Sequence, residues 1–392
     1  MPHYKYLIVG GGITADAAVE GIRSIDREAA IGLIGAEPDP PYNRPPLSKG
    51  LWKGDALERI WRKTQARGVD LYLGRKAVSL DFAARAINDS QGARYTYEKL
   101  LLATGVTPRR LPSASGVIYY RALSDYNTLR ALSGEGRSFA VIGGGFIGWE
   151  IAAALKMNGN EVVMIFPEET IGARLYPADL GRFLNRYYRE KGVRIVAGGQ
   201  ITALEKTPRG ARVQTQAHGN FEVDGVVAGI GVTPETSLAQ AAGLKIDNGI
   251  MVDEFLRTSD PHIYAAGDVA NFHNPILDRR LRVEHEDNAN VMGRAAGANM
   301  AGGQAPYRHL PFFYSDLFEL GYEAVGDLDP RLEIVADWKE PYREGVLYYL
   351  QAGRVRGVLL WNTYGQVDEA RKLIAEPGPF RPADLKGRLP AA

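Results

Sequence analysis

Short apolar segments, each followed by a glycine-rich turn and a helix-like stretch, recur along the chain. Residues 4–9 read as a buried strand that leads into Gly10 and Gly12, and small apolar residues then continue as a helix. The same order returns where an apolar strand ends at Ile142 and a helix is expected over 146–157. Because strands that are buried on both faces of a parallel sheet are short and continuously apolar, this pattern predicts an α/β fold built on parallel sheets.

Two glycine motifs give the strongest chemical signal. In the G-x-G-x-x-G pattern, the first glycine makes a tight turn, the second lets the backbone approach a pyrophosphate, and the third lets the helix pack closely on the strand. The second motif has all three glycines, whereas the first has alanine at its third position, which still allows close packing. The motifs are Gly10, Gly12 and Ala15, and Gly143, Gly145 and Gly148. Two such motifs predict two Rossmann-like, three-layer domains and two bound dinucleotides.

The chain after the second motif changes pattern. Between 193 and 230, apolar and polar residues alternate in short segments that read as an antiparallel meander. From about His309, short apolar segments and one helix over 366–375 indicate a separate α+β module, and the tail from Pro377 is expected to be irregular. The predicted domains are a first dinucleotide-binding domain over 1–114 and 235–308, a second over 115–234, and a C-terminal α+β domain over 309–392.

Carboxylates near the strand ends are candidates for binding an adenosine ribose. Glu37 lies about 20 residues after the first glycine turn, where such a carboxylate is expected, and a surface glutamate is the alternative. After the second motif, Phe166 occupies the usual position and Glu168 follows slightly late. A carboxylate there would repel a 2′-phosphate and favour NADH. Arg174 lies a little downstream, so NADPH stays an open alternative.

A proline-rich loop and several small-residue turns are further candidates for cofactor contact. Residues 40–52 contain four prolines and carry Arg44 and Lys49, which suits phosphate or flavin contacts; a charged surface connector is the alternative. The turn over 103–105 follows an apolar strand and permits close backbone approach. Asp268 lies in a later turn, where its carboxylate either accepts from a polyol or caps the helix that follows.

Cysteine is absent, which removes several kinds of chemistry. Structural disulfides, thiolate zinc sites, Cys-ligated iron–sulfur clusters and cysteine redox relays are excluded. The six histidines form no H-E-x-x-H pattern, so no metal site is expected.

The charges nearly cancel, with 47 Lys+Arg against 46 Asp+Glu and a net charge of +1. This balance argues against a nucleic-acid partner. The densest basic run, 279–282, is expected to be a solvated loop, with a docking patch for an acidic protein as the alternative. No apolar run reaches about 18 residues and the first strand begins close to Met1, so no membrane span or signal peptide is expected and the predicted location is cytoplasmic.

These motifs together resemble the FAD- and NAD(P)H-dependent pyridine nucleotide reductases that carry an added C-terminal domain. That group includes the apoptosis-inducing factors and the ferredoxin and rubredoxin reductases. The resemblance runs from Gly10 to about Gly365. Its most specific segments are 44–49, 103–105, 266–270 and 283–285. Within the group, Glu284, His285 and residues 313–316 match the apoptosis-inducing factor branch best.

The resemblance implies that the first motif binds FAD and the second binds NAD(P)H, so that hydride passes from the nicotinamide to flavin N5. It places Lys49 near N5, with Glu150 as its ionic partner beside the nicotinamide, since each buried charge needs the other once water is excluded. His285 completes the expected catalytic set; it stands where many oxygenase-coupled ferredoxin reductases have tryptophan, and it can titrate. The expected cofactor-binding residues are Gly10, Gly12, Ala15, Glu37, Arg44, Lys49, Val78, Ala103, Thr104, Gly105, Arg109, Gly267, Asp268, Glu284, His285, Tyr314, Gly143, Gly145, Phe146, Ile147, Gly148, Glu150, Glu168 and Gly231.

An NAD(P)H-dependent FAD oxidoreductase, with NADH favoured, is the leading functional hypothesis. Electrons would leave to a ferredoxin- or rubredoxin-type iron–sulfur protein, a quinone or oxygen. The absence of cysteine removes the disulfide reductases and the cysteine-dependent peroxidases that share the two-domain plan. The alternative is an apoptosis-inducing factor-like redox sensor, whose NADH-reduced state controls homodimer formation or partner binding. A flavin monooxygenase is less favoured, because such enzymes often carry a single G-x-G-x-x-G motif.

Overall fold

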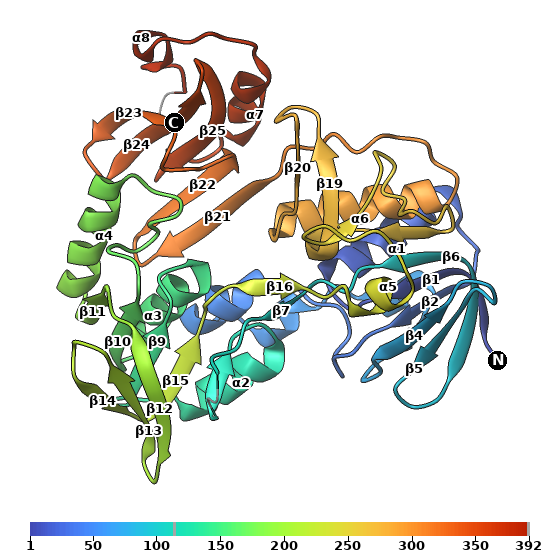
Figure 1. Ribbon diagram of the computed structural model, residues 1–392, viewed down its shortest axis with the longest axis horizontal. Helices are drawn as coiled ribbons and strands as arrows, with labels where there is room; N and C mark the ends of the chain where they lie inside the picture. Colours follow the sequence, from blue (N-terminus) through green and yellow to red (C-terminus); the bar gives the residue numbers. More distant parts are fainter. Residues whose placement is uncertain (113–114, 390–392) are drawn as a thin grey trace. The chain divides into compact units, whose positions relative to one another are not determined.

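The chain divides between two units in the computed structural model, which describes residues 1–112 and 115–389 (Figure 1). Unit 1 consists of Met1–Arg44, Leu57–Thr107 and Thr233–Pro311, and unit 2 consists of Pro45–Ala56, Pro108–Val232 and Phe312–Ala392. The segment Pro45–Ala56 therefore groups with the second glycine motif and not with the first. The division into three domains stays a prediction, and its boundary at 114–115 adjoins residues 113–114, which lie outside the described part.

A seven-stranded sheet carries the first glycine motif in unit 1. Its strands are β1 (His3–Val9), β2 (Ile31–Ile34), β3 (Val69–Tyr72), β4 (Ala77–Asp81), β5 (Ala86–Asp89), β6 (Arg94–Leu102) and β18 (Ile263–Ala265). The order is β3-β2-β1-β6-β5-β4, with β18 also paired to β6. β1, β2, β3, β6 and β18 pair in parallel, so Val9 lies opposite both Ile34 and Leu102. The turns that follow these strands consequently meet at one edge of the sheet.

Two helices of unit 1 pack against each other very closely, and Figure 1 shows them side by side. They are α1 (Ile13–Ile25) and α6 (Glu286–Met300). A Cβ added to Gly21 would lie 2.0 Å from the Arg294 carbonyl oxygen, and one added to Gly297 would lie 2.0 Å from that of Ala18. The small residues at these positions therefore allow the two helix backbones to come into contact. Other elements of unit 1 are α5 (Ser237–Ala241), β17 (Ile250–Met251), β19 (Ala270–Asn274), β20 (Arg279–Leu281) and the short 3-10 helices Leu57–Ile60, Thr64–Arg67 and Gly267–Val269.

A five-stranded parallel sheet carries the second glycine motif in unit 2, in the order β11-β10-β9-β15-β8. Its strands are β8 (Val117–Tyr119), β9 (Ser138–Ile142), β10 (Glu161–Phe166), β11 (Val193–Ala197) and β15 (Gly225–Ala228), and its helices are α2 (Leu123–Leu132), α3 (Phe146–Met157) and α4 (Ala178–Glu190). The Asp125 carboxylate accepts hydrogen bonds from the backbone N–H groups of Arg121 and Ala122 and so secures the start of α2. The short strands β7 (Val106–Pro108) and β16 (Val232–Pro234) lie where the chain passes between the units.

The prediction of an antiparallel meander over 193–230 is wrong at both ends. Only β12 (Ile201–Thr207), β13 (Gly210–Thr215) and β14 (Asn220–Val223) form an antiparallel sheet. β11 and β15 instead join the parallel sheet. All four residues of β15 are buried, because the strand lies between β8 and β9, and a strand in that position shows a continuous apolar run instead of alternation.

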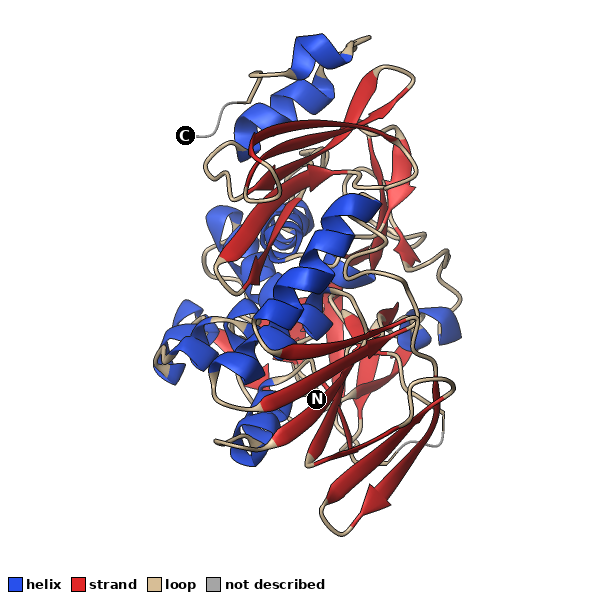
Figure 2. Cartoon of the chain, turned by 90° about the vertical axis from the view of Figure 1, so that its left-hand side faces the viewer, coloured by secondary structure: helices blue, strands red, loops and turns tan. Residues whose placement is uncertain are grey.

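The C-terminal part of unit 2 is an antiparallel sheet in the order β21-β22-β25-β24-β23, and Figure 2 shows its strands in red. The strands are β21 (Phe312–Leu317), β22 (Leu320–Gly326), β23 (Glu333–Glu340), β24 (Glu344–Gln351) and β25 (Arg354–Trp361), followed by α7 (Val367–Ala375).

The expected irregular tail in fact contains the one-turn helix α8 (Pro382–Leu385). The Asp384 carboxylate stabilises its start by accepting from the Arg381 backbone N–H at 2.9 Å. Across the described residues, no helix combines the length and apolar character needed to cross a membrane.

Candidate functional site

The first glycine turn leaves open space at the start of α1. Gly10 has φ +129°, and a Cβ there would lie 2.1 Å from the Ala103 carbonyl oxygen, so only glycine fits. Gly12 precedes the helix with extended backbone, and no described side chain forms a hydrogen bond that caps it. A Cβ added to Gly12 would meet no described atom within 4 Å. The protein itself does not require glycine at this position, whereas a phosphate group seated on the helix start would.

The second turn repeats this geometry in unit 2. A Cβ on Gly143, whose φ is +112°, would lie 2.3 Å from the Gly229 carbonyl oxygen, and one on Gly148 would lie 2.0 Å from the Gly143 carbonyl oxygen. Gly145 has φ −99° and ψ −172°, close to the −98° and −168° of Gly12, and it also has no described atom within 4 Å of an added Cβ. The two turns are therefore equivalent cradles for a pyrophosphate, and each fits a dinucleotide.

The third position of the motif differs between the turns. Ala15 is fully buried in α1, so this helix accommodates a methyl group where α3 requires Gly148. Phe146 begins α3, and its ring centroid lies 4.9 Å from that of Trp149. Ile147 follows, and its Cβ would lie 3.0 Å from a Cβ added to Gly229.

The turn after β6 lies beside the first glycine motif. The Ala103 N–H donates to the Val9 carbonyl at 2.8 Å. The Thr104 hydroxyl donates to the Glu235 carbonyl at 2.7 Å, and the Glu235 N–H donates to the Gly105 carbonyl at 3.0 Å. These bonds hold the small-residue turn at the carboxyl edge of the sheet, where the resemblance places FAD.

Glu37 and Arg44, two expected FAD contacts, form an ion pair in unit 1. The Tyr42 hydroxyl also donates to the Glu37 carboxylate, at 2.5 Å.

Asp268 lies inside the 3-10 helix Gly267–Val269, which leads into strand β19. The alternative role of Asp268 as the cap of a following α-helix therefore does not apply.

His285 immediately precedes α6 and is held neutral by its surroundings. Burial lowers the pKa of His285 to about 4, although Asp268 and Asp287 act in the opposite direction. The adjacent Glu284 pairs with Arg282 at 2.6 Å. The imidazole was expected to titrate, and at neutral pH its pKa leaves it uncharged instead.

The basic run over 279–282 was expected to be a solvated loop. Arg279 to Leu281 form strand β20 instead. Arg280 donates to the Val252 carbonyl at 2.8 Å, and Arg282 donates to the Asp268 carbonyl at 3.1 Å. These two side chains are therefore engaged within unit 1, which argues against a docking patch for an acidic protein.

Other expected contact residues lie in varied surroundings. In unit 2 the Arg109 N–H donates to the Gly231 carbonyl at 2.9 Å. Glu168 pairs at 2.9 Å with Arg174, whose side chain is 85% exposed. Val78 lies on β4 and is 55% exposed. The cofactor roles of these residues stay predictions.

Lys49 and Glu150 meet inside unit 2, and the expected ion pair is confirmed. The Lys49 Nζ lies 2.5 Å from Glu150 Oε1, and their side chains are 13% and 5% exposed. The Tyr314 ring centroid lies 5.3 Å from the same Nζ, within the range of a cation–π interaction. Two hydroxyls that were not among the expected site residues complete the cluster, because Ser48 donates to Glu150 Oε2 at 2.6 Å and Ser315 donates to Oε1 at 2.5 Å.

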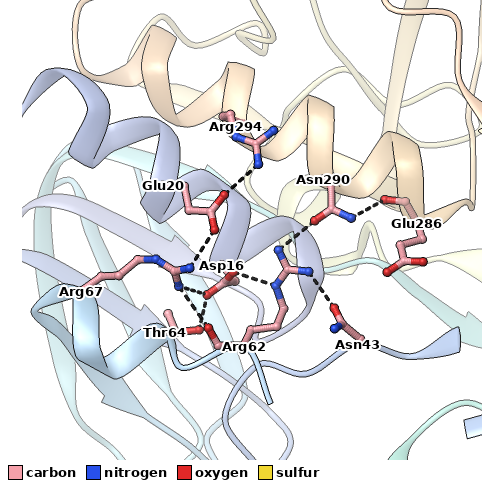
Figure 3. Close-up of polar contacts among 9 residues, drawn as sticks. All are labelled: Asp16, Glu20, Asn43, Arg62, Thr64, Arg67, Glu286, Asn290 and Arg294. Carbon is pink, nitrogen blue, oxygen red and sulfur yellow. Dashed lines mark hydrogen bonds and ion pairs between the residues drawn. The ribbon is translucent and has the colours of Figure 1, made fainter. Parts of the chain in front are cut away.

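A separate buried network anchors the helix that follows the first glycine turn (Figure 3). The Asp16 side chain is 1% exposed and accepts from Arg62 at 2.7 Å, from Arg67 at 2.6 Å and from the Thr64 hydroxyl at 2.5 Å. Arg67 also pairs with Glu20 at 2.7 Å. Further contacts visible in Figure 3 are Glu20 with Arg294, and Arg62 with Asn43 and Asn290. The network ties the segment between β2 and β3 to α1 and α6, and so fixes the cradle.

Paired glycine cradles on two parallel sheets, with a buried Lys–Glu pair, define the class of flavoproteins that bind two dinucleotides. A family model agrees with this class. Residues 4–302 match the model described as pyridine nucleotide-disulphide oxidoreductase, so the chain belongs to that family. Residues 296–341 and 336–376 match the model of the C-terminal domain of mitochondrion-associated apoptosis-inducing factor. The chain is an oxidoreductase that uses FAD and NAD(P)H.

Individual relatives align over nearly the whole chain. The ferredoxin–NAD(+) reductase component of the anthranilate 1,2-dioxygenase system of Burkholderia cepacia is 36% identical, with 97% of each chain covered. Apoptosis-inducing factor 1 of Dictyostelium discoideum is 32% identical over 95% of this chain and 78% of the relative. A putidaredoxin reductase solved in covalent complex with putidaredoxin has a TM-score of 0.90 and 30% identity, with 98% of this chain and 95% of the other covered.

Proposed function

We propose that this protein takes electrons from NADH through FAD and delivers them to a small iron–sulfur protein of the ferredoxin type. The observation that carries the proposal is the pair of equivalent glycine cradles, one in each unit, which suits one FAD and one nicotinamide dinucleotide. The reductase relatives, which cover this chain almost completely, support the choice of acceptor. A cytoplasmic location, where NADH is available, fits this reaction.

In this proposal the first cradle, at Gly10 and Gly12, holds the FAD pyrophosphate, and Glu37 binds the adenosine ribose. The second cradle, at Gly143 and Gly145, holds the nicotinamide dinucleotide. FAD, when bound, supplies the hydride-accepting N5 atom; the protein contributes position and electrostatics. The proposed domains follow the same division, with FAD on 1–114 and 235–308, NADH on 115–234, and the C-terminal domain over 309–392.

Lys49 and Glu150 are proposed to act where the nicotinamide meets the flavin. The charge of Lys49 would favour negative charge on the flavin ring, and Glu150 keeps the ammonium in place at 2.5 Å. His285, neutral at physiological pH, would offer an uncharged ring to the cofactors. For the nucleotide, Glu168 favours NADH over NADPH, because its carboxylate would repel a 2′-phosphate. The Arg174 side chain that pairs with Glu168 is able to bind a 2′-phosphate, so NADPH is the alternative.

The acceptor is tested by comparing turnover with a ferredoxin, a quinone and oxygen at equal concentrations. We expect the NADH-reduced protein to be reoxidised fastest by the ferredoxin. Faster reoxidation by the quinone or by oxygen would contradict the proposed acceptor and leave the NADH-to-FAD step standing.

A redox-sensing role is the second candidate, favoured by the match of the C-terminal residues to the apoptosis-inducing factor model. In that case NADH would reduce the flavin, reoxidation would be slow with every acceptor, and the reduced protein would form a homodimer. Light scattering before and after anaerobic addition of NADH distinguishes the two functions. A monomer that turns over rapidly with ferredoxin excludes the sensor.

A further inference from the structure

We propose that Ser315 and Ser48 are positioning residues that hold the Glu150 carboxylate, and through it the Lys49 ammonium, in a single arrangement. This inference rests on the proposed function, because it assigns the two hydroxyls to the hydride-transfer site. Neither serine is an expected cofactor contact. Both act through Glu150, which they bond on opposite oxygens.

Both oxygens of the Glu150 carboxylate accept hydrogen bonds. Oε1 accepts from Lys49 Nζ and from the Ser315 hydroxyl, each at 2.5 Å, and Oε2 accepts from the Ser48 hydroxyl at 2.6 Å. Because the two oxygens have different donors, rotation of the carboxylate would break at least one hydrogen bond. Glu150 and both serines are buried, so a broken bond would not be replaced easily by water.

Trp149 fixes the direction of the Ser315 hydroxyl. Its indole Nε1–H lies 2.7 Å from Ser315 Oγ, and an indole nitrogen can only donate. Ser315 Oγ must therefore accept this bond, and its single hydrogen remains for Glu150. Trp149 is fully buried, and its ring lies 5.8 Å from that of Tyr176. The chain Trp149 to Ser315 to Glu150 thus has one donor direction throughout.

Ser48 is constrained in a different way. Its hydroxyl lies 2.6 Å from Glu150 Oε2 and 3.4 Å from the Pro45 carbonyl, and its one hydrogen favours the nearer, charged acceptor. The following residue, Lys49, lies between the 3-10 helices Pro45–Ser48 and Gly50–Lys53, and the Leu47 carbonyl accepts from the Trp52 indole at 2.8 Å. The Ser48 hydrogen bond therefore attaches the loop that contains Lys49 to the Glu150 carboxylate, which is the ionic partner of this lysine.

The tyrosines near Glu150 carry no charge that would act on its carboxylate. Burial raises the pKa of Tyr188 and of Tyr322, and the Glu150 charge raises both further, so both phenols are neutral. The arrangement of the carboxylate therefore depends on Lys49 and the two serines.

Three separate segments of the chain build this cluster, and all belong to unit 2. Pro45–Ala56 supplies Ser48, helix α3 supplies Glu150, and strand β21 of the C-terminal sheet supplies Ser315. The C-terminal sheet therefore takes part in the chemistry of the site through Ser315. It does so next to Tyr314, whose ring faces the Lys49 ammonium at 5.3 Å.

The test measures the reactivity of Lys49 in FAD-free protein. Limited acetylation with acetic anhydride, followed by mass spectrometry of the Lys49 peptide, is compared for Ser315→Ala, Ser48→Ala, the double variant and Ser133→Ala. Ser133 follows helix α2, and its hydroxyl donates to the Arg130 carbonyl at 2.9 Å instead of to Glu150, so Ser133→Ala serves as the control. We expect acetylation of Lys49 to be several-fold faster in each single variant, fastest in the double variant, and unchanged in the control.

The FAD-loaded protein provides the functional readout. Anaerobic stopped-flow reduction by NADH is expected to show a several-fold lower limiting rate in the serine variants, with a nearly unchanged half-saturating NADH concentration. Trp149→Phe keeps an aromatic ring, although a smaller one, and removes the N–H donor, so it should give a smaller effect of the same kind. It also provides a second variant if Ser315→Ala does not fold.

Wild-type acetylation kinetics of Lys49 in the folded double variant and in Trp149→Phe would overturn the proposal. A rise in the half-saturating NADH concentration as large as the fall in the limiting rate would also overturn it, because that pattern indicates general damage to binding. If the wild-type protein fails to bind FAD or to react with NADH, the proposed function fails, whereas the acetylation experiment on FAD-free protein still decides whether the serines position Lys49.

Discussion

Lys49 Nζ lies 2.5 Å from Glu150 Oε1, and both side chains are largely buried although they come from distant parts of the sequence. The pair joins the proline-rich loop to the helix of the second glycine motif. Water is mostly excluded from both charges, so each depends on the other and on the hydroxyls around them. Several measurable consequences follow from this arrangement and from the glycine cradles.

Removing the carboxylate should destabilise the protein. Glu150→Leu leaves the Lys49 ammonium buried without its partner, and the loss is expected to be about 3 kcal/mol or more in free energy of unfolding. Denaturant unfolding monitored by tryptophan fluorescence measures it. Glu168→Gln is the control, since Glu168 pairs with the 85% exposed Arg174 and should cost less than about 1 kcal/mol. Equal losses in the two variants would contradict the account.

Two glycines of the second motif should respond differently to alanine. Gly145→Ala should fold normally, because its φ of −99° suits alanine and the added Cβ meets no described atom within 4 Å. Its affinity for NADH should nevertheless fall on the order of tenfold, about 1.4 kcal/mol, if a phosphate occupies that space. Gly143→Ala should instead lower the thermal midpoint, because its Cβ would lie 2.3 Å from the Gly229 carbonyl oxygen.

Calorimetry with NADH and thermal unfolding separate the two effects. A Gly145→Ala variant with wild-type NADH affinity would show that nothing approaches this glycine.

The pKa of His285 gives a testable pH dependence. In the folded protein it is about 4, below the usual value of 6.5, so the unfolded state binds the proton more readily. The stabilising effect of the neutral ring is complete above pH 6.5 and is lost as the pH falls toward 4. The difference in unfolding free energy between wild type and His285→Gln should therefore change across that window and stay constant between pH 7 and 8. A break near pH 6.5 in an NMR titration of His285 would contradict this.

The Asp16 network should be a major source of stability in unit 1. Asp16→Ala leaves Arg62 and Arg67 without their shared buried acceptor, and we expect a loss of about 3 kcal/mol together with weaker retention of FAD. Asp81→Ala is the matched control, because its pair with Arg94 is about equally exposed on both sides and should contribute less than about 1 kcal/mol. Thermal unfolding and flavin absorbance after gel filtration measure the two effects. Similar losses for both variants would argue against a special role of the network.

Local signals in the sequence were sufficient for most of the α/β core. The bounds expected for α3, 146–157, agree with the structure, since the helix has a clear apolar pattern and ends at Asn158. The strand β15 was misread because four residues cannot show which sheet they join. Its parallel pairing with β9 depends on a partner far away in the chain.

The site was predictable to the extent that its motifs are contiguous. The glycine cradles and Lys49 fall within such motifs, and the Lys49–Glu150 pair followed from the resemblance. Ser48 and Ser315 lie in segments that carry the resemblance, yet their hydroxyls gain a role only when three segments converge on Glu150. The donor direction set by Trp149 depends on a distance of 2.7 Å that no spacing in the sequence encodes.

The most direct test of the central claim is an anaerobic titration of the purified, FAD-loaded protein with NADH, followed by flavin absorbance. The account predicts a yellow protein whose flavin bleaches with one equivalent of NADH and regains its colour on addition of an oxidised ferredoxin. A protein that cannot be loaded with FAD, or whose flavin stays oxidised in excess NADH and NADPH, would contradict it.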